Sequence, residues 1–132
     1  MGDVKYLLDT HTLLWMACEE NKLGKKAVSI LEDISSVLYV SSASAYEIMQ
    51  KYRIGKLLGY SYVVENYFSV IHSLGLKELS INSHHASFAG NFEWLHRDPF
   101  DRLLAAQAKI ENLTLITSDE AFQTLSWIDI LW

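Results

Sequence analysis

Residues 4–15 read VKYLLDTHTLLW, and this stretch joins a short buried strand to the start of a helix. Residues 4–8 are apolar apart from Lys5 and include a β-branched and an aromatic side chain, a composition typical of a strand. The DTHT that follows supplies oxygen-bearing side chains that cap helices. The stretch therefore predicts a strand over residues 4–8 and a helix from Thr10 to about Cys18.

The same succession of strand and helix recurs along the rest of the chain. Short apolar or alternating segments predict four further strands, at 37–40, 76–81, 113–117 and 128–131. Apolar residues at helical spacing, or capping residues before them, predict helices at 24–34, 45–57, 62–74, 83–94, 99–111 and 120–125. The connections are too long for hairpins, so the strands should be parallel and joined by right-handed crossovers. This pattern predicts an α/β fold with a central parallel β-sheet flanked by α-helices on both faces.

Length and composition indicate a single globular domain over residues 1–132. Half of the residues are hydrophobic, and six glycines and one proline leave no obvious linker. The lone Cys18 cannot form an internal disulfide, and no apolar run is long enough to span a bilayer. Asp3, Lys5 and Asp9 interrupt the apolar core that a signal peptide needs. We therefore expect a cytoplasmic protein that does not associate with membranes.

The net charge argues against a protein that coats nucleic acid without regard to sequence. Sixteen acidic and eleven basic residues give a formal charge of −5 at pH 7, whereas non-specific binding to a polyanion relies on positive charge. Six of the basic residues fall between positions 22 and 56. Solvated helix faces explain each of them singly, although together they leave room for a local basic rim.

Five carboxylates follow predicted strands or lie near predicted helix starts: Asp9, Glu47, Asp98, Asp101 and Asp119. In a parallel sheet these positions share the edge where the carboxyl ends of the strands meet. Mg²⁺ and Mn²⁺ are hard cations that take oxygen ligands. Such an ion lowers the pKa of a bound water and neutralises charge that develops on a phosphate. Metal-dependent chemistry on a phosphate is therefore one interpretation of these acids.

Helix capping is the other interpretation, because helix starts favour acidic and hydroxyl side chains whatever the function. Ser44-x-x-Glu47 has the form of a capping box. The remaining acids stand where caps or first turns are expected: Asp9, Asp98, Asp101 and Asp119. Taken one at a time, capping is the simpler explanation. A non-catalytic α/β protein-binding module whose acidic residues are helix caps therefore stays open.

Four segments resemble, in order and spacing, the motifs of PIN-domain ribonucleases, in particular the VapC-type toxins of bacterial toxin–antitoxin pairs. They are YLLDTHTLLW, SSASAYEIMQKYRIGKL, HRDPFDRLLAAQA and LTLITSDEAF. The resemblance covers nearly the whole chain, and its first and third segments are the most specific. It implies a PIN fold, a requirement for Mg²⁺ or Mn²⁺, hydrolytic cleavage of phosphodiester bonds in RNA, and neutralisation by a cognate antitoxin protein.

Carried over by position, the resemblance assigns the metal-binding and catalytic roles to four acids. These are Asp9, Glu47, Asp101 and Asp119, with the Thr117 hydroxyl as a neighbour. Asp98 belongs to the same DPFDR segment, but Asp101 lies nearer the helical LLAAQA run, so Asp98 is assigned mainly to the cap. His96 and Arg97 precede this segment and are candidates for contact with a phosphate, and Tyr46 and Tyr52 for contact with RNA bases.

A homodimer is expected as well, because the helices between positions 24 and 74 carry more apolar residues than one small sheet needs. These residues are Ile48, Met49, Tyr52, Tyr62, Val63, Tyr67 and Phe68. The resemblance points the same way. A phosphoacceptor domain fits less well, since no second acid pairs with Asp9 and LTLITSDEAF provides no lysine at the end of its strand.

Overall fold

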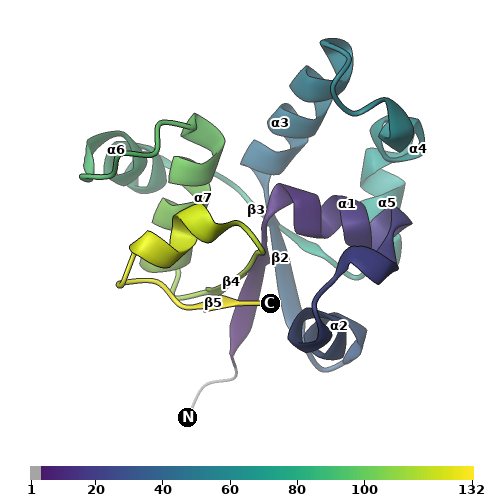
Figure 1. The fold of residues 1–132 in the computed structure, drawn as a ribbon, viewed down its shortest axis with the longest axis horizontal. Coiled ribbons are helices and arrows are strands. Elements are labelled where there is room, and N and C mark those ends of the chain that lie inside the picture. The colour runs from purple at the N-terminus through teal and green to yellow at the C-terminus, as the bar shows by residue number, and fades with distance from the viewer. Residues whose placement is uncertain (1–3) are drawn as a thin grey trace.

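Five short parallel strands form one sheet in the order β3-β2-β1-β4-β5 (Figure 1). The structure is a computed structural model, and it describes residues 4–132. The strands are β1 Lys5–Leu8, β2 Val37–Ser41, β3 Lys77–Leu79, β4 Thr114–Ile116 and β5 Ile130–Leu131. The parallel sheet predicted from the alternating pattern is confirmed, and the last apolar segment pairs at its edge.

Seven α-helices and three 3₁₀ turns connect the strands. The helices are α1 Thr10–Cys18, α2 Lys25–Glu32, α3 Ser42–Arg53, α4 Ser61–Glu65, α5 Tyr67–Ser73, α6 Ser83–Asn91 and α7 Pro99–Ile110. The 3₁₀ turns are η1 Glu20–Lys22, η2 Leu58–Tyr60 and η3 Glu120–Thr124. None of the helices in residues 4–132 has the length and apolar content needed to cross a membrane.

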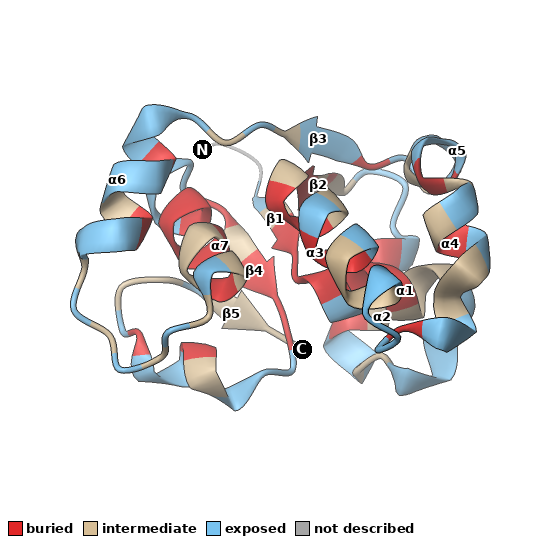
Figure 2. Ribbon diagram, turned by 90° about the horizontal axis from the view of Figure 1, so that it is seen from above, coloured by how far each residue is buried: buried red, intermediate tan, exposed pale blue. Residues whose placement is uncertain are grey.

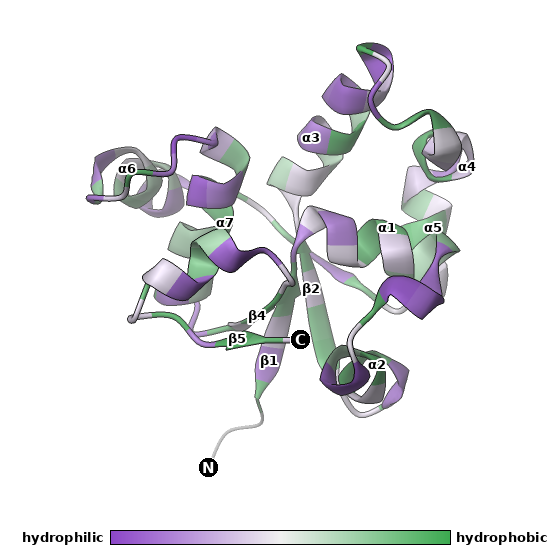
Figure 3. Ribbon diagram, viewed as in Figure 1, coloured by the Kyte–Doolittle hydropathy of each residue, from purple (hydrophilic) through white to green (hydrophobic). Residues whose placement is uncertain are grey.

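Alternation along the strands divides the apolar core between the two faces of the sheet. Leu8 and Ile116 belong to a core shared with α1 to α5, whereas Leu7 and Leu115 belong to a second core formed with α7 and the residues around η3. Figure 2 shows the helices in these two groups on either side of the buried strands. The hydropathy colours follow the same plan, with β2 apolar and the far end of α3 hydrophilic (Figure 3).

The order of the strands makes the boundary between β1 and β4 a topological switch point. From β1 the chain moves outward to β2 and β3, and α6 and α7 then return it across the other face to β4. The loops beyond β1 and β4 therefore lead away in different directions, and α/β proteins typically bind ligands at such a point. Residues that directly follow β1 and β4, above all Asp9 and Thr117, lie at this end of the sheet.

Four predicted helices differ from the observed ones. The helix expected over 45–57 spans Ser42–Arg53, and the one expected over 120–125 is the 3₁₀ turn η3. The helix expected over 62–74 is broken at Asn66, whose φ and ψ of −126° and 30° leave the helical region. The Asn66 side-chain amide and the Asn66 backbone N–H both donate to the carbonyl of Tyr62 at 3.0 Å, so the two groups share this helical acceptor. The helix expected over 83–94 ends at Asn91, and residues 92–98 form a loop that leads into α7.

The apolar residues that suggested a dimer are divided between the core and the surface. Ile48, Val63 and Tyr67 are buried within the chain's own first core, so that part of the argument is wrong. Tyr62 and Phe68 remain largely exposed. The homodimer itself stays a prediction that now depends on a smaller set of side chains.

Candidate active site

Asp9 occupies the end of β1 and is almost fully buried, with 8% of its surface exposed. One carboxylate oxygen accepts from the Thr10 backbone N–H at 2.7 Å and so caps α1, as expected. The other accepts from the Thr117 hydroxyl at 2.7 Å. Burial raises the pKa of Asp9 despite these hydrogen bonds, because a desolvated negative charge is disfavoured. Asp9 therefore combines a capping role with a charge that a cation would stabilise.

Asp101 lies in the first turn of α7 and is also buried, but it does not cap the helix. Asp98 is the cap, and its Oδ1 accepts from the N–H groups of Phe100 at 2.8 Å and of Asp101 at 3.3 Å. The carboxylate of Asp101 instead meets His96, with 2.6 Å between Oδ2 and Nε2. Burial raises the pKa of Asp101 to about 7, and the nearby acids Asp9, Asp98 and Asp119 add to this against the opposing His96 hydrogen bond.

Asp119 is exposed beyond β4 and caps η3, with Oδ1 accepting from the Ala121 N–H at 3.0 Å. Its own backbone N–H donates to the Thr117 hydroxyl at 3.0 Å, and the same hydroxyl donates to Asp9. Thr117 therefore lies beside Asp9, as expected, and ties the loop that carries Asp119 to the end of β1.

Glu47 reaches the site from α3, and its surroundings correct the predicted capping box. Helix α3 begins at Ser42 and is capped by Ser41, whose hydroxyl accepts from the Ala43 N–H at 3.0 Å, so the box from Ser44 to Glu47 is wrong. Glu47 is 3% exposed and accepts from the Thr10 hydroxyl at 2.6 Å through Oε1. Its Oε2 lies 2.5 Å from the Lys51 ammonium one turn later. Glu47 is thus bonded by one tertiary contact, to Thr10, and by one contact within α3, to Lys51, rather than by the helix start.

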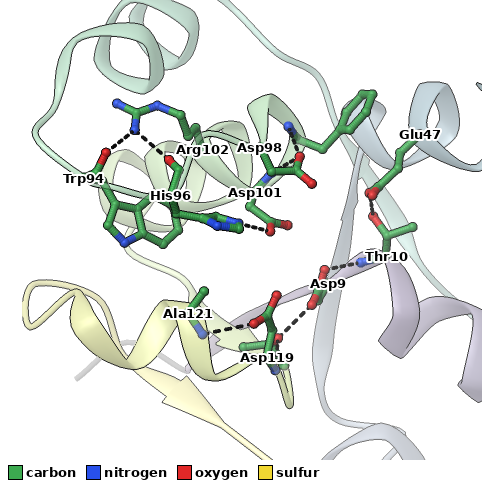
Figure 4. Close-up of polar contacts among 12 residues, drawn as sticks. Asp9, Thr10, Glu47, Trp94, His96, Asp98, Asp101, Arg102, Asp119 and Ala121 are labelled. Atoms are coloured by element: carbon green, nitrogen blue, oxygen red, sulfur yellow. Dashed lines mark hydrogen bonds and ion pairs between the residues drawn. The ribbon is translucent and has the colours of Figure 1, made fainter.

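The carboxylates of Asp9, Asp98, Asp101 and Asp119 face a common space, with Glu47 at its border beyond Thr10 (Figure 4). Within residues 4–132, one group of three metal-type side chains brings its ligand atoms within 4.8 Å of one another: His96, Asp98 and Asp101. Asp98 thus caps α7, as predicted, and also belongs to this group. The four predicted acids do not bring their ligand atoms this close together within the described residues.

The donor set fits a hard divalent cation. Carboxylate oxygens predominate, two of the carboxylates have raised pKa values, and no arginine is bonded to these acids in the described residues. A cation there would be favoured because it relieves the mutual repulsion of the acids. Lys51 is the competing positive charge, and it lies at the Glu47 side of the space.

Arg102 is the site-adjacent residue that the sequence reasoning missed. Its guanidinium donates to the backbone carbonyls of Ala89 at 2.7 Å, Trp94 at 3.2 Å and His96 at 3.0 Å, and also to that of Phe92. It lies 4.3 Å from the centre of the Phe92 ring. The signal that could have revealed it was an arginine directly after Asp101 in the HRDPFDR segment.

Comparisons with known proteins identify the fold and the family of the chain. The family model of the PIN domain matches residues 6–128. A chain from the VapBC2 structure of Rickettsia felis, bound to a DNA fragment from its promoter, aligns with TM-score 0.69 and 18% identity over 97% of this chain and 98% of that one. A toxin–antitoxin complex from Klebsiella pneumoniae gives TM-score 0.67 and 18% identity over 97% of each chain.

DNA-bound VapBC from Salmonella typhimurium is a third similar structure, with TM-score 0.65 and 20% identity over 98% of each chain. No curated protein sequence gives a significant match. At these identities the solved structures establish a shared fold. The family follows from the PIN-domain model, which spans nearly the whole chain, and this protein belongs to the PIN-domain family.

Proposed function

We propose that this protein is a VapC-like toxin, a metal-dependent endoribonuclease that hydrolyses phosphodiester bonds in RNA. The observation that carries the proposal is the burial of Glu47 and Asp101, two carboxylates that accept no hydrogen bond from a backbone N–H among the described residues. Capping explains Asp9, Asp98 and Asp119, but it does not explain these two. Buried acids at a topological switch point, one of them Asp101 with a pKa raised by burial, are typical of a functional site.

Asp9, Asp101 and Asp119 would hold Mg²⁺ or Mn²⁺, with Glu47 as the fourth acid. A bound ion supplies an activated water and neutralises charge on the phosphate that is cut. The chain's own groups orient the acids: Thr117 donates to Asp9, and Thr10 donates to Glu47. These bonds hold two of the carboxylates in fixed rotamers before any substrate arrives.

Lys51 is the basic group best placed for a phosphate. Its ammonium lies at the border of the acidic space and its side chain is 27% exposed. It also lines a groove of about 740 Å³ between α3 and α7, together with Tyr46, Asp98 and Phe100. A strand of RNA lying in this groove would bring its backbone past the acids while a base contacts the aromatic rings.

A cognate antitoxin and a second copy of the chain are the proposed protein partners. The similar structures from Rickettsia felis, Klebsiella pneumoniae and Salmonella typhimurium are of VapBC or toxin–antitoxin complexes, which supports the first of these. Acidic side chains that face one space suit an inhibitor that places an arginine among them, since a guanidinium satisfies carboxylates and displaces a cation. Inhibition should then weaken as the metal concentration rises.

Cleavage of total cellular RNA, followed by sequencing of the new ends, tests the proposal. The wild-type protein should cut in Mg²⁺ or Mn²⁺ and not in EDTA, and Asp101→Asn should remove cleavage. Glu32→Gln is the matched control, because Glu32 is exposed on α2. Cleavage that persists in EDTA would contradict the metal-dependent mechanism. No cleavage with either ion would favour the protein-binding module.

A further inference from the structure

The loop between α6 and α7 brings His96 to Asp101, and its conformation depends on one arginine. We propose that His96 is a positioning residue that fixes the Asp101 carboxylate for the cation, and that Arg102 holds the loop in the shape that permits this contact. The proposal rests on the proposed function, because it concerns the metal site assigned there. It gives a role to a histidine and an arginine outside the four acids.

Arg102 fastens the loop through its backbone. The carbonyls it binds belong to residues 89, 92, 94 and 96, which span the end of α6 and most of the loop. Residues 92–98 have no regular secondary structure, so these carbonyls have no ladder or helical partner. With Nε and both Nη atoms occupied, the guanidinium is committed to the loop rather than to a phosphate.

His96 is held through both its backbone and its ring. Its backbone carbonyl accepts from Arg102, and its ring lies 4.8 Å from that of Trp94. Trp94 is itself anchored, since its indole N–H donates to the Thr124 hydroxyl at 2.9 Å. From this position His96 Nε2 lies 2.6 Å from Oδ2 of Asp101, where an Nε2–H would donate to the ionised carboxylate.

The contact leaves the other carboxylate oxygen of Asp101 available. Among the described residues no group donates to Oδ1, and Figure 4 shows the carboxylate facing the space shared with Asp9 and Asp119. A carboxylate held through one oxygen loses less rotational freedom when the other binds a cation. Such outer partners of metal ligands typically change metal affinity by about 10- to 100-fold when removed.

Mn²⁺ binding by the full chain tests the proposal, and titration calorimetry and electron paramagnetic resonance measure that binding. His96→Ala should weaken Mn²⁺ binding by about tenfold. His96→Gln keeps an N–H donor and should retain most of the affinity. If both variants lose affinity equally and the wild-type Mn²⁺ signal carries nitrogen coupling, His96 is a ligand and the positioning role is overturned.

Arg102→Lys tests the second half of the proposal, because lysine keeps the charge but cannot bind four carbonyls in fork geometry. It should weaken Mn²⁺ binding in the wild-type background and have little further effect in the His96→Ala background. Equal losses in both backgrounds would show that Arg102 does not act through His96. Thermal melting of each variant verifies that it is folded, and His96→Gln carries the test if another variant is not.

Asp101→Asn separates this proposal from the proposed function. If Asp101→Asn binds Mn²⁺ as the wild type does, the assigned metal site is wrong. If Asp101→Asn abolishes binding while His96→Ala leaves it unchanged, the site stands and only the positioning role is overturned.

Discussion

The Lys51 ammonium lies 2.5 Å from Oε2 of Glu47, one turn away on the same helix, so one of the expected metal ligands is already paired with a cation. Burial works against the charge on Lys51, but the hydrogen bond and negative charge of Glu47, with Asp98 and Asp101 farther off, raise the pKa of Lys51 overall. The lysine therefore remains charged at neutral pH. It acts as an internal counter-ion for the acids and competes with any metal that binds near Glu47.

Lys51→Met should consequently improve metal binding while impairing RNA cleavage. Removing the ammonium frees Glu47 and should raise Mg²⁺ affinity by roughly fivefold, equivalent to about 1 kcal/mol, the order of one charge pair in a solvated site. Cleavage should fall, because the variant loses the basic group nearest the acids. Titration calorimetry and an RNA cleavage assay measure the two effects. Lys26→Met, at an exposed position of α2, is the control, and weaker Mg²⁺ binding by Lys51→Met would contradict this view.

Asp101→Asn and Asp98→Ala should differ in their effect on metal-free stability, although each removes one negative charge. Asp98 caps α7 through two backbone N–H groups, and loss of such a cap typically costs about 1 kcal/mol. Asp101 caps no helix, and its charged form is disfavoured by burial and by repulsion from the neighbouring acids. Asp101→Asn should therefore melt no lower than the wild type in EDTA.

Melting curves in EDTA and in Mg²⁺ measure both variants. The wild type should gain stability from Mg²⁺ because the ion binds only the folded acids, and Asp101→Asn should lose that gain. If Asp101→Asn were less stable than the wild type in EDTA, kept the wild-type response to Mg²⁺ and still cut RNA, Asp101 would only stabilise the first turn of α7 and would not bind the metal.

Metal-free stability should fall as the pH rises. The pKa of Asp101 rises from its ordinary value of 3.8 to about 7 on folding, so between these values the folded state binds more protons than the unfolded state. The stability contributed by protonated Asp101 is thus complete below the unfolded pKa and is lost as the pH rises through the folded one. The pKa of Asp9 is raised as well, and it acts in the same direction.

Urea unfolding midpoints across this pH range, in EDTA and in Mg²⁺, give the measurement. The decline in EDTA should be smaller for Asp101→Asn, and Mg²⁺ should reduce it in the wild type by favouring the charged carboxylates. If the wild-type urea midpoint in EDTA rose with pH relative to the midpoint of Asp101→Asn, the raised pKa of Asp101 would be contradicted.

The sequence predicted those parts of the site that depend on the ends of strands. Asp9 and Thr117 follow β1 and β4, and parallel strands must bring such positions to one edge. The capping box at Ser44 was wrong because Ser41 precedes it and caps α3 first. Ser44 and Glu47 instead form hydrogen bonds with Thr10, which precedes them by 34 and 37 residues. A local sequence pattern cannot reveal contacts between residues so far apart in the chain.

The loop before α7 was beyond sequence reasoning for a different reason. Residues 92–98 have no periodicity, and three of their carbonyls accept from the Arg102 guanidinium, which also binds the Ala89 carbonyl in α6. The break at Asn66 is also absent from the periodicity, because a single residue leaves the helical region while its backbone N–H still donates to the Tyr62 carbonyl. Periodicity predicts elements, whereas side-chain contacts and the conformation of single residues determine where they end.

Phe68→Glu should convert the expected homodimer to a monomer. Phe68 is 79% exposed and, with Tyr46 and Met49, lines a groove of about 650 Å³ between α3 and α5. An exposed aromatic side chain beside an apolar groove is typical of a surface that another chain covers. A charge there would have to be buried without a partner in the dimer, but it would stay solvated in the monomer.

Sedimentation velocity at micromolar concentration measures the change. Ile34→Glu is the matched control, because Ile34 is fully exposed in the segment between α2 and β2, away from this groove. The wild type and Ile34→Glu should sediment as dimers, and Phe68→Glu should sediment as a monomer. The Phe68→Glu monomer should still be folded, because Phe68 contributes little to the core. A wild-type protein that sediments only as a monomer would remove the dimer, and a dimeric Phe68→Glu would place its interface elsewhere on the molecule.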